Sequence, residues 1–269
     1  MSSQKARFFV VLSVCLRRRV ELPGAYSPRL LDSVILKPGE KEHLLQDLEK
    51  FRSSRDRYRR LGVPYHRGYL LYGPPGTGKT SLVSALGAKC GMSIYVVNLT
   101  DFADRTLKKA INDVPENSIV LFEDIDCMRA GHRREQTETR ELQAVPADGR
   151  EKKAEPQIGV TLSGLLNVLD GFFAPENVVF VMTTNHMEQL DPALLRPGRI
   201  DYRLYMGEAT DRQRVELYRR FFPESTEAKA VEFAQAHCTE TMAEFQGMLL
   251  ALEQEWNSIE NETECSQVL

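Results

Sequence analysis

Gly73-Pro74-Pro75-Gly76-Thr77-Gly78-Lys79-Thr80 is the stretch of this sequence that decides the fold. It fits the pattern G-x-x-x-x-G-K-[ST], in which glycines let the backbone curl so that its N–H groups point at phosphate oxygens. Lys79 is expected to reach the β- and γ-phosphates of ATP, and the Thr80 hydroxyl to ligate Mg²⁺. An apolar run precedes the loop and a helical pattern follows it, as a phosphate site requires. This context disfavours the alternative, a merely structural turn.

Apolar runs and helical patterns alternate on both sides of the loop. Strands are expected at 68–72, 93–98, 118–125, 177–183 and 202–206, and helices at 41–60, 79–89, 103–112, 161–169 and, briefly, 192–195. Such alternation predicts a parallel sheet flanked by helices, with ligands at the carboxyl ends of the strands. After residue 210 only helical patterns remain, at 211–222, 227–237 and 241–259. The predicted fold class is α/β: a P-loop nucleotide-binding domain followed by a small all-helical domain.

The predicted domains are an N-terminal segment at 1–27, an ATPase domain at 28–207 and a helical domain at 208–269. Residues 128–159 are polar and poor in large apolar side chains, so we expect a flexible surface insertion there. Residues 8–16 are apolar but too few for a membrane-spanning helix, which needs about 20. Their β-branched and aromatic composition favours a strand. A transit peptide is the alternative, since no acidic residue precedes Glu21.

Charge and cysteine usage exclude some classes of function. The net charge of -3 gives no reason to expect nucleic acid as a partner. Five cysteines lie far apart without a C-x-x-C pair, so no zinc site is expected. The helix expected at 41–60 ends in a basic run. That run is either a solvated face or a contact with a neighbouring subunit.

Carboxylates follow the strand expected at 118–125, about 40 residues after the phosphate loop. Glu123 and Asp124 close an apolar run, and a magnesium–nucleotide site needs acidic groups at such a strand tip. One carboxylate would hold the metal through water, and its neighbour would polarise the attacking water. We expect both to be catalytic, with Glu123 joining Thr80 at the metal.

Two further blocks complete the predicted site. The apolar stretch from Val178 to Asn185 ends in Thr183-Thr184-Asn185, and the Asn185 amide could orient the lytic water; a satisfied turn residue is the alternative. Arg196 and Arg199 follow a short helical pattern and could present guanidinium groups to a γ-phosphate. Because they lie far from the phosphate loop in sequence, we expect them to act on the ATP of the next subunit. Structural salt bridges are the alternative.

These four blocks, in this order, resemble the AAA ATPases, and more closely the Rieske-protein-translocating subgroup known from the mitochondrial inner membrane. The likeness spans residues 31–252. Its further strings are Tyr65-His66-Arg67-Gly68-Tyr69-Leu70-Leu71-Tyr72, Glu123-Asp124-Ile125-Asp126, Thr161-Leu162-Ser163-Gly164-Leu165-Leu166-Asn167-Val168-Leu169-Asp170-Gly171 and Thr183-Thr184-Asn185-His186.

The resemblance implies roles for individual residues. Asn185 matches the first sensor, Arg196 and Arg199 match the arginine fingers, and the C-terminal helices match the lid over the nucleotide. Residues 62–64 occupy the stretch that usually lines the adenine pocket, which adds Val63 to the predicted nucleotide site. The other members of that site are Gly73, Pro74, Pro75, Gly76, Thr77, Gly78, Lys79, Thr80 and Ser81.

The sequence departs from the AAA pattern in three places. Most AAA proteins have Asp then Glu at the strand tip, whereas this chain has Glu123 then Asp124. The order is similar to that of the subgroup, but the shorter Asp predicts slow hydrolysis. The loop at 98–104 lacks the glycine of threading motors, which favours a machine that handles folded clients. The subgroup's membrane helix and specific domain precede its ATPase, and residues 8–27 are interpreted as a remnant of that region.

Together these features predict an ATP hydrolase that forms a ring of six or seven identical subunits. It would act as a chaperone, remodelling or translocation machine on a protein client, without nucleic acid and without a membrane span. A cytoplasmic location is expected, with association with the mitochondrial inner membrane as the alternative. A nucleotide-gated binding module with little turnover and a DNA-dependent AAA ATPase are the other functions left open.

Overall fold

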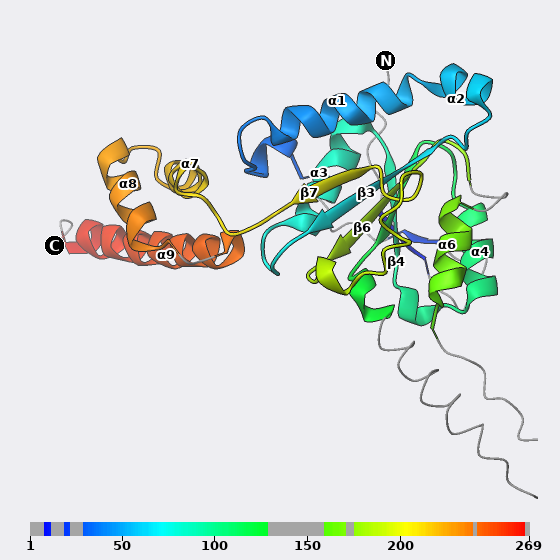
Figure 1. The fold of residues 1–269 in the computed structure, drawn as a ribbon. Coiled ribbons are helices and arrows are strands. Elements are labelled where there is room, and N and C mark those ends of the chain that lie inside the picture. The colour runs from blue at the N-terminus through cyan, green and yellow to red at the C-terminus, as the bar shows by residue number, and fades with distance from the viewer. Residues whose placement is uncertain are drawn as a thin grey trace, which may run out of the picture.

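The apolar runs on both sides of the phosphate loop form one sheet, seen in a computed structural model of the chain (Figure 1). The structure describes residues 8–11, 19–21, 29–128, 159–170, 175–238 and 241–266. The strands in these ranges are β1 (Phe8–Val11), β2 (Arg19–Glu21), β3 (His66–Tyr72), β4 (Ser93–Val97), β5 (Ser118–Phe122), β6 (Val178–Thr184) and β7 (Tyr202–Tyr205).

The helices cover both faces of this sheet and then continue beyond it. They are α1 (Glu40–Arg52), α2 (Arg55–Leu61), α3 (Lys79–Cys90), α4 (Asp104–Asn112), α6 (Leu162–Asp170), α7 (Asp211–Phe221), α8 (Glu227–Ala236) and α9 (Met242–Ser266). Short 3-10 helices occur at Leu31–Ser33, Leu99–Asp101, Ile125–Met128 and Met187–Gln189.

The strand order is β2-β1-β4-β5-β6-β3-β7. Neighbours from β1 to β7 are parallel, and only the β1–β2 pair is antiparallel. The predicted parallel sheet flanked by helices is therefore confirmed, and so is the strand expected within residues 8–16. Every residue of β5 and β6 is buried, because parallel strands packed on both faces become continuous apolar runs.

The order of the strands determines what meets at the site. β3 lies between β6 and β7, so the loop after β3 adjoins the ends of both neighbours. Along the β3–β6 pair, Leu70 is opposite Met182 and Tyr72 is opposite Thr184. The phosphate loop therefore begins beside Asn185.

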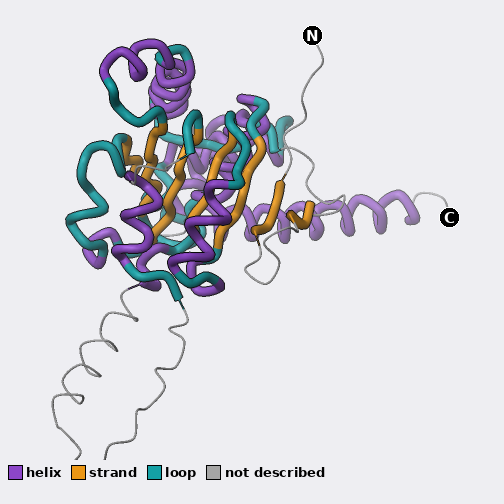
Figure 2. The backbone as a smooth tube through the Cα atoms, turned by 90° about the vertical axis from the view of Figure 1, so that its right-hand side faces the viewer, coloured by secondary structure: helices purple, strands orange, loops and turns teal. Residues whose placement is uncertain are grey.

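Two apolar clusters fill the space between the sheet and its helices, one on each face. The first includes Leu107 of α4 and Leu165 of α6, and the second includes Leu48 of α1 and Leu82 of α3. Figure 2 shows the twisted strands sandwiched between these helical layers. The two clusters hold the strand ends in fixed positions, which is what positions the site.

Local hydrogen bonds change three of the predicted elements. The helix expected at 41–60 is two helices, because the hydroxyls of Ser53 and Ser54 donate to the Lys50 carbonyl at 3.1 and 2.5 Å and compete with the helical pattern. The helix expected at 192–195 is a run of turns, in which Asp191 Oδ1 accepts from Ala193 N at 2.8 Å. The strand expected to reach residue 125 ends at Phe122. Residues 129–158, nearly all of the predicted insertion, lie outside the described residues.

The three helices after residue 210 form a separate small cluster. Leu217, Phe245 and Leu249 are buried there together with Ile35, which lies between the first 3-10 helix and α1. Arg214 is buried in their midst, and its Nε donates to the Ala234 carbonyl at 3.0 Å. The last helix is longer than expected, since α9 continues to Ser266. No helix in the described part of the chain is both long and apolar enough to cross a bilayer.

Candidate nucleotide site

The phosphate loop connects β3 to α3 through three glycines with positive φ. Gly73, Gly76 and Gly78 have φ values of 137°, 74° and 93°, which side-chain-bearing residues rarely adopt. At Gly73 a Cβ would lie 2.1 Å from the Met206 carbonyl oxygen. The loop is thus compatible only with glycine there, and it directs backbone N–H groups and the start of α3 toward one point.

Lys79 is the first residue of α3, and its side chain is only 8% exposed. Its Nζ donates to the carbonyls of Gly73 and Pro74, each at 2.7 Å, and to Asn185 Oδ1 at 2.8 Å. Burial lowers the pKa of this ammonium group, and the charges of Asp124 and Asp126 act in the opposite direction. The ammonium is held at the mouth of the loop, where phosphate oxygens would replace or join its present acceptors.

Thr80 and Glu123 meet across the loop. The Thr80 hydroxyl donates to Glu123 Oε1 at 2.8 Å. Mg²⁺ prefers oxygen ligands, and it takes one or two protein groups plus nucleotide phosphates instead of an all-protein cage. The described residues contain no group of three or more His, Cys, Asp or Glu side chains that could hold a metal. A threonine–carboxylate pair beside a phosphate loop therefore fits Mg²⁺ bound together with a nucleotide.

Asp124 lies on the other side of this centre, next to Asn185. Its φ is 47°, so the backbone turns sharply at the tip of β5, and its N–H donates to Thr183 Oγ1 at 3.1 Å. Asn185 Nδ2 lies 3.4 Å from Asp124 Oδ1, a long hydrogen bond. Asn185 thus contacts both the lysine and the second carboxylate.

Buried threonines hold these groups from behind, and the sequence-based prediction did not include them in the site. Thr184 is fully buried, and its hydroxyl donates to Asp126 Oδ1 at 2.7 Å. The Thr184 hydroxyl oxygen also accepts from His186 N at 3.0 Å. Two consecutive threonines at the end of a wholly apolar strand were the available signal, since a buried hydroxyl needs a partner.

Arg196 and Arg199 are far from the phosphate loop of their own chain. A Cβ at Gly68 would clash with the Arg199 carbonyl, and Gly68 lies five strand residues before Gly73, about 17 Å at 3.3 Å per residue. Arg199 is anchored, since its Nε donates to Asp170 Oδ2 and its Nη1 to the Ala193 carbonyl, each at 2.7 Å. Arg196 is exposed and forms no ion pair within the described ranges.

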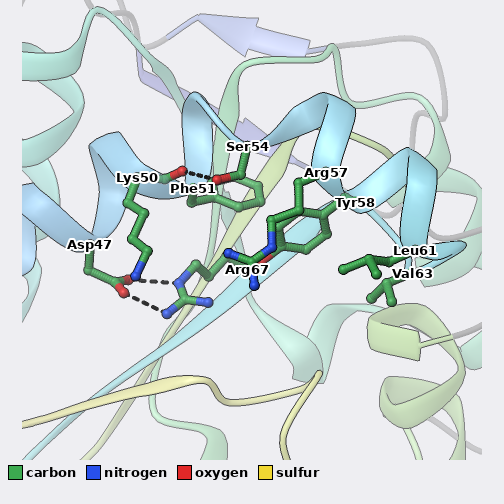
Figure 3. Close-up of a pocket in the computed structure, with 9 residues that line it drawn as sticks. All are labelled: Asp47, Lys50, Phe51, Ser54, Arg57, Tyr58, Leu61, Val63 and Arg67. Carbon is green, nitrogen blue, oxygen red and sulfur yellow. Dashed lines mark hydrogen bonds and ion pairs between the residues drawn. The ribbon is translucent and has the colours of Figure 1, made fainter.

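Val63 is also separated from the loop. It lies before the amino end of β3 and lines a pocket with residues of α1 and α2 (Figure 3). The seven residues of β3 intervene, about 23 Å of strand, so the structure does not bring Val63 to the predicted nucleotide site. Ser81, by contrast, is in the first turn of α3, and its hydroxyl accepts from Arg29 Nη1 at 2.7 Å.

Arg29 and Ile35 connect the two parts of the molecule near the loop. Arg29 reaches α3 through Ser81, while the Ile35 carbonyl accepts from Gln213 Nε2 of α7 at 3.0 Å. The first turn of α9 also touches the loop, where Ala243 N donates to the Gly76 carbonyl at 3.0 Å. The start of α9 is thus hydrogen-bonded to the phosphate loop itself.

Comparison with known proteins agrees with this geometry. A family model described as ATPase family associated with various cellular activities (AAA) matches residues 69–208. The chain is 40% identical over 225 residues to "Mitochondrial chaperone BCS1" of Danio rerio, covering 81% of this chain and 51% of that protein. It is 38% identical over 209 residues to "Mitochondrial chaperone BCS1" of Homo sapiens, covering 77% and 47%.

A fungal relative gives a similar result. The chain is 38% identical over 230 residues to "Probable mitochondrial chaperone bcs1" of Schizosaccharomyces pombe, covering 83% of this chain and 47% of that protein. The chain spans about half the length of the curated relatives it matches.

Proposed function

The chain belongs to the AAA ATPase family, and on that premise we propose that it hydrolyses Mg-ATP in a homo-oligomeric ring that acts on a protein client. The contact that carries this proposal is the one between Asn185 and two other groups. Asn185 bonds the Lys79 ammonium at 2.8 Å and reaches the Asp124 carboxylate at 3.4 Å. A phosphate-binding lysine, a carboxylate and a polar amide converge on one point, which is the arrangement that attack on a γ-phosphate requires.

The proposed roles divide between the two carboxylates. Glu123 accepts from Thr80 at 2.8 Å, so Thr80 and Glu123 would hold Mg²⁺, which when bound neutralises developing charge on the phosphates. Asp124 lies beside Asn185, so Asp124 would accept a proton from the attacking water while Asn185 orients that water. Lys79 would hold the β- and γ-phosphates.

The positions of Arg196 and Arg199 are the reason for proposing a ring. Both are remote from the phosphate loop of their own chain, so either would reach a nucleotide only across a subunit contact. Arg199 is fixed by Asp170 and the Ala193 carbonyl, whereas Arg196 is exposed. We therefore assign Arg196 as the group that contacts the neighbour's γ-phosphate and Arg199 as the residue that shapes its loop. Family members typically assemble, which supports a ring without giving the number of subunits.

We base the proposed compartment on the names of the relatives, and the proposed kind of client on the side chain of Phe102. The relatives are named mitochondrial chaperones, which favours the mitochondrial location over a cytoplasmic one and a chaperone role for this chain. Phe102, the aromatic residue of the loop after β4, is 1% exposed and packs in the core. It cannot grip an extended peptide in that position, which supports a client that stays folded.

Subunit complementation tests the proposal. Lys79→Ala strongly weakens ATP binding by a subunit but keeps its Arg196, and Arg196→Ala does the reverse. Each variant alone should hydrolyse ATP slowly. An equimolar mixture should regain activity, because ATP bound to an Arg196→Ala subunit can then face the intact Arg196 of a neighbouring Lys79→Ala subunit. Native mass spectrometry confirms mixed assemblies. Mixed rings without regained activity would exclude action across the contact, and a wild-type rate per subunit that is independent of dilution would exclude the ring.

A nucleotide-gated module with little turnover is the second candidate. The observation that favours it is the length of the Asp124 side chain, one methylene shorter than the Glu most family members carry, at a point where its contact with Asn185 is already long at 3.4 Å. Single-turnover phosphate release distinguishes the two. Release that is equally slow in wild-type and Asp124→Asn protein would favour the module.

A further inference from the structure

A basic pocket lies at the amino end of β3, and the phosphate loop follows the opposite end of the same strand. Its volume is about 320 Å³, and Figure 3 shows that α1, α2 and β3 contribute its walls. The lining residues are Asp47, Lys50, Phe51, Ser54, Arg57, Tyr58, Leu61, Val63 and Arg67. The nucleotide chemistry proposed above uses none of these side chains.

The pocket carries more positive charge than its own carboxylate can balance. Arg67 is paired with Asp47 through two hydrogen bonds, from Nε at 2.7 Å and from Nη2 at 2.5 Å. Lys50 and Arg57 are exposed, and neither forms an ion pair within the described residues. Residues 50–60 contain six basic side chains and one acidic side chain. The pocket therefore suits an acidic partner.

Part of the lining is apolar, which distinguishes the pocket from a simple charged face. Leu61 and Val63 are 64% and 49% exposed, although they are large apolar side chains next to each other on one rim (Figure 3). The ring of Phe51 contacts that of Tyr58, with centroids 5.8 Å apart. Aromatic and apolar surface beside cations suits a segment with both acidic and aromatic groups.

The end of α9 has this composition. No Lys or Arg occurs after Lys229, and residues 253–264 contain five glutamates. Phe245, Leu249 and Leu252 belong to the cluster shared with α7 and α8. Their spacing of four and three residues continues in the sequence with Trp256 and Ile259, so an apolar stripe at helical period runs into the acidic part.

We propose that the basic pocket, defined by the nine lining residues above, receives residues 253–264 of α9 from a second copy of this chain. The inference rests on the proposed ring and specifies one of its contacts. Figure 1 places α2 and the C-terminal end of α9 at opposite sides of the molecule, and in Figure 2 that end projects away from the sheet, so a chain does not fill its own pocket. Complementary surfaces at opposite sides give a head-to-tail contact, which is the type that closes into rings.

Charge reversal and restoration test this contact. The pocket variant is Lys50→Glu with Arg57→Glu, the helix variant is Glu253→Lys with Glu255→Lys and Glu260→Lys, and a third protein combines both. Each single set should raise the protein concentration needed for assembly at least tenfold, measured by sedimentation with ATP. The combined protein should recover most of the assembly, because both sets of charges are then reversed and attract each other again. Arg105→Glu with Lys109→Glu, two exposed residues of α4, is the matched control.

Trp256 gives a second measurement, because it is the single tryptophan of the chain. Its emission should shift to shorter wavelength as wild-type protein assembles, and the pocket variant should not show the shift. Circular dichroism and binding of a fluorescent ATP analogue establish that the variants fold. Failure of wild-type protein to assemble would count against the ring. Assembly of wild type that neither reversal weakens would overturn the docking contact alone.

Discussion

The two ends of β3 are both crowded with charge, yet their charges are arranged differently. At the amino end, Asp47 accepts from Arg67 Nε, from Arg67 Nη2 and from the Tyr69 hydroxyl, all within 2.7 Å. At the carboxyl end, the Asp124 carboxylate has a single hydrogen bond among the described residues, a long one of 3.4 Å from Asn185. A carboxylate with saturated partners stabilises a fold, whereas one with few partners can take a proton or orient water. Charge alone therefore does not identify the reactive end.

The pKa values follow the same division. Burial and the bond to Asp47 raise the pKa of the Tyr69 hydroxyl. Burial would lower the pKa of Arg67, but its bond to Asp47 raises it instead. These shifts keep the Tyr69 hydroxyl and the Arg67 guanidinium protonated at any physiological pH. At the carboxyl end the pKa of Lys79 is lowered by burial, and an anion bound there would act in the opposite direction and favour the charged form.

The largest effect on ATP binding is expected from Lys79→Met at the carboxyl end. Loss of about two charge-assisted bonds to phosphate, each about 1.5 kcal/mol, should weaken ATP binding by about 100-fold. Titration with a fluorescent ATP analogue measures this. Lys89→Met is the control, because Lys89 is exposed at the other end of the same helix. Equal affinities for the two variants would contradict the assignment of the loop.

Asp124→Asn should separate binding from hydrolysis. The amide keeps the shape but cannot accept a proton, so hydrolysis should slow by about 100-fold or more while ATP affinity changes little. Glu123→Gln should instead raise the Mg²⁺ concentration needed for activity, because Glu123 adjoins Thr80. Rates measured across a Mg²⁺ series distinguish the two. An opposite pattern would exchange the roles of the two carboxylates.

Tyr69→Phe should affect stability and leave the chemistry intact. It removes one hydrogen bond to Asp47 at the amino end, which should lower the free energy of unfolding by about 1 kcal/mol. Urea denaturation measures the change, with Tyr202→Phe on neighbouring β7 as the control, since the Tyr202 hydroxyl has no hydrogen bond among the described residues. A clear loss of ATP turnover would show that the two ends are coupled.

Val63→Ala should leave ATP affinity within about twofold of wild type, because about 23 Å of strand separates Val63 from Gly73. Binding is measured at protein concentrations below those that permit assembly. A tenfold loss of affinity would place the adenine near α2. It would contradict the view that only the carboxyl end of β3 binds the nucleotide.

How much could be predicted from the sequence depends on the range of the interaction. The phosphate loop and the apolar strands β5 and β6 are local patterns, and they were predicted with small errors at their ends. The break at Ser53 and the turn at Asp124 depend on hydrogen bonds to Lys50 and Thr183, which no periodicity reveals. The anchoring of Arg199 by Asp170 and the position of Val63 depend on contacts between distant segments. The sequence marks these residues without showing what they face.

The hydrogen bond from Ala243 to the Gly76 carbonyl, 3.0 Å long, has a mechanical consequence. Gly76 also lies against Thr241, since a Cβ there would be 3.0 Å from the Thr241 hydroxyl. The 25 residues of α9 begin at this contact and extend about 37 Å as a stiff rod. A tilt of about 5° at the loop would swing the far end of the rod by about 3 Å. A small rotation at the phosphate loop would thus be amplified along α9 into a shift of several ångströms at its far end.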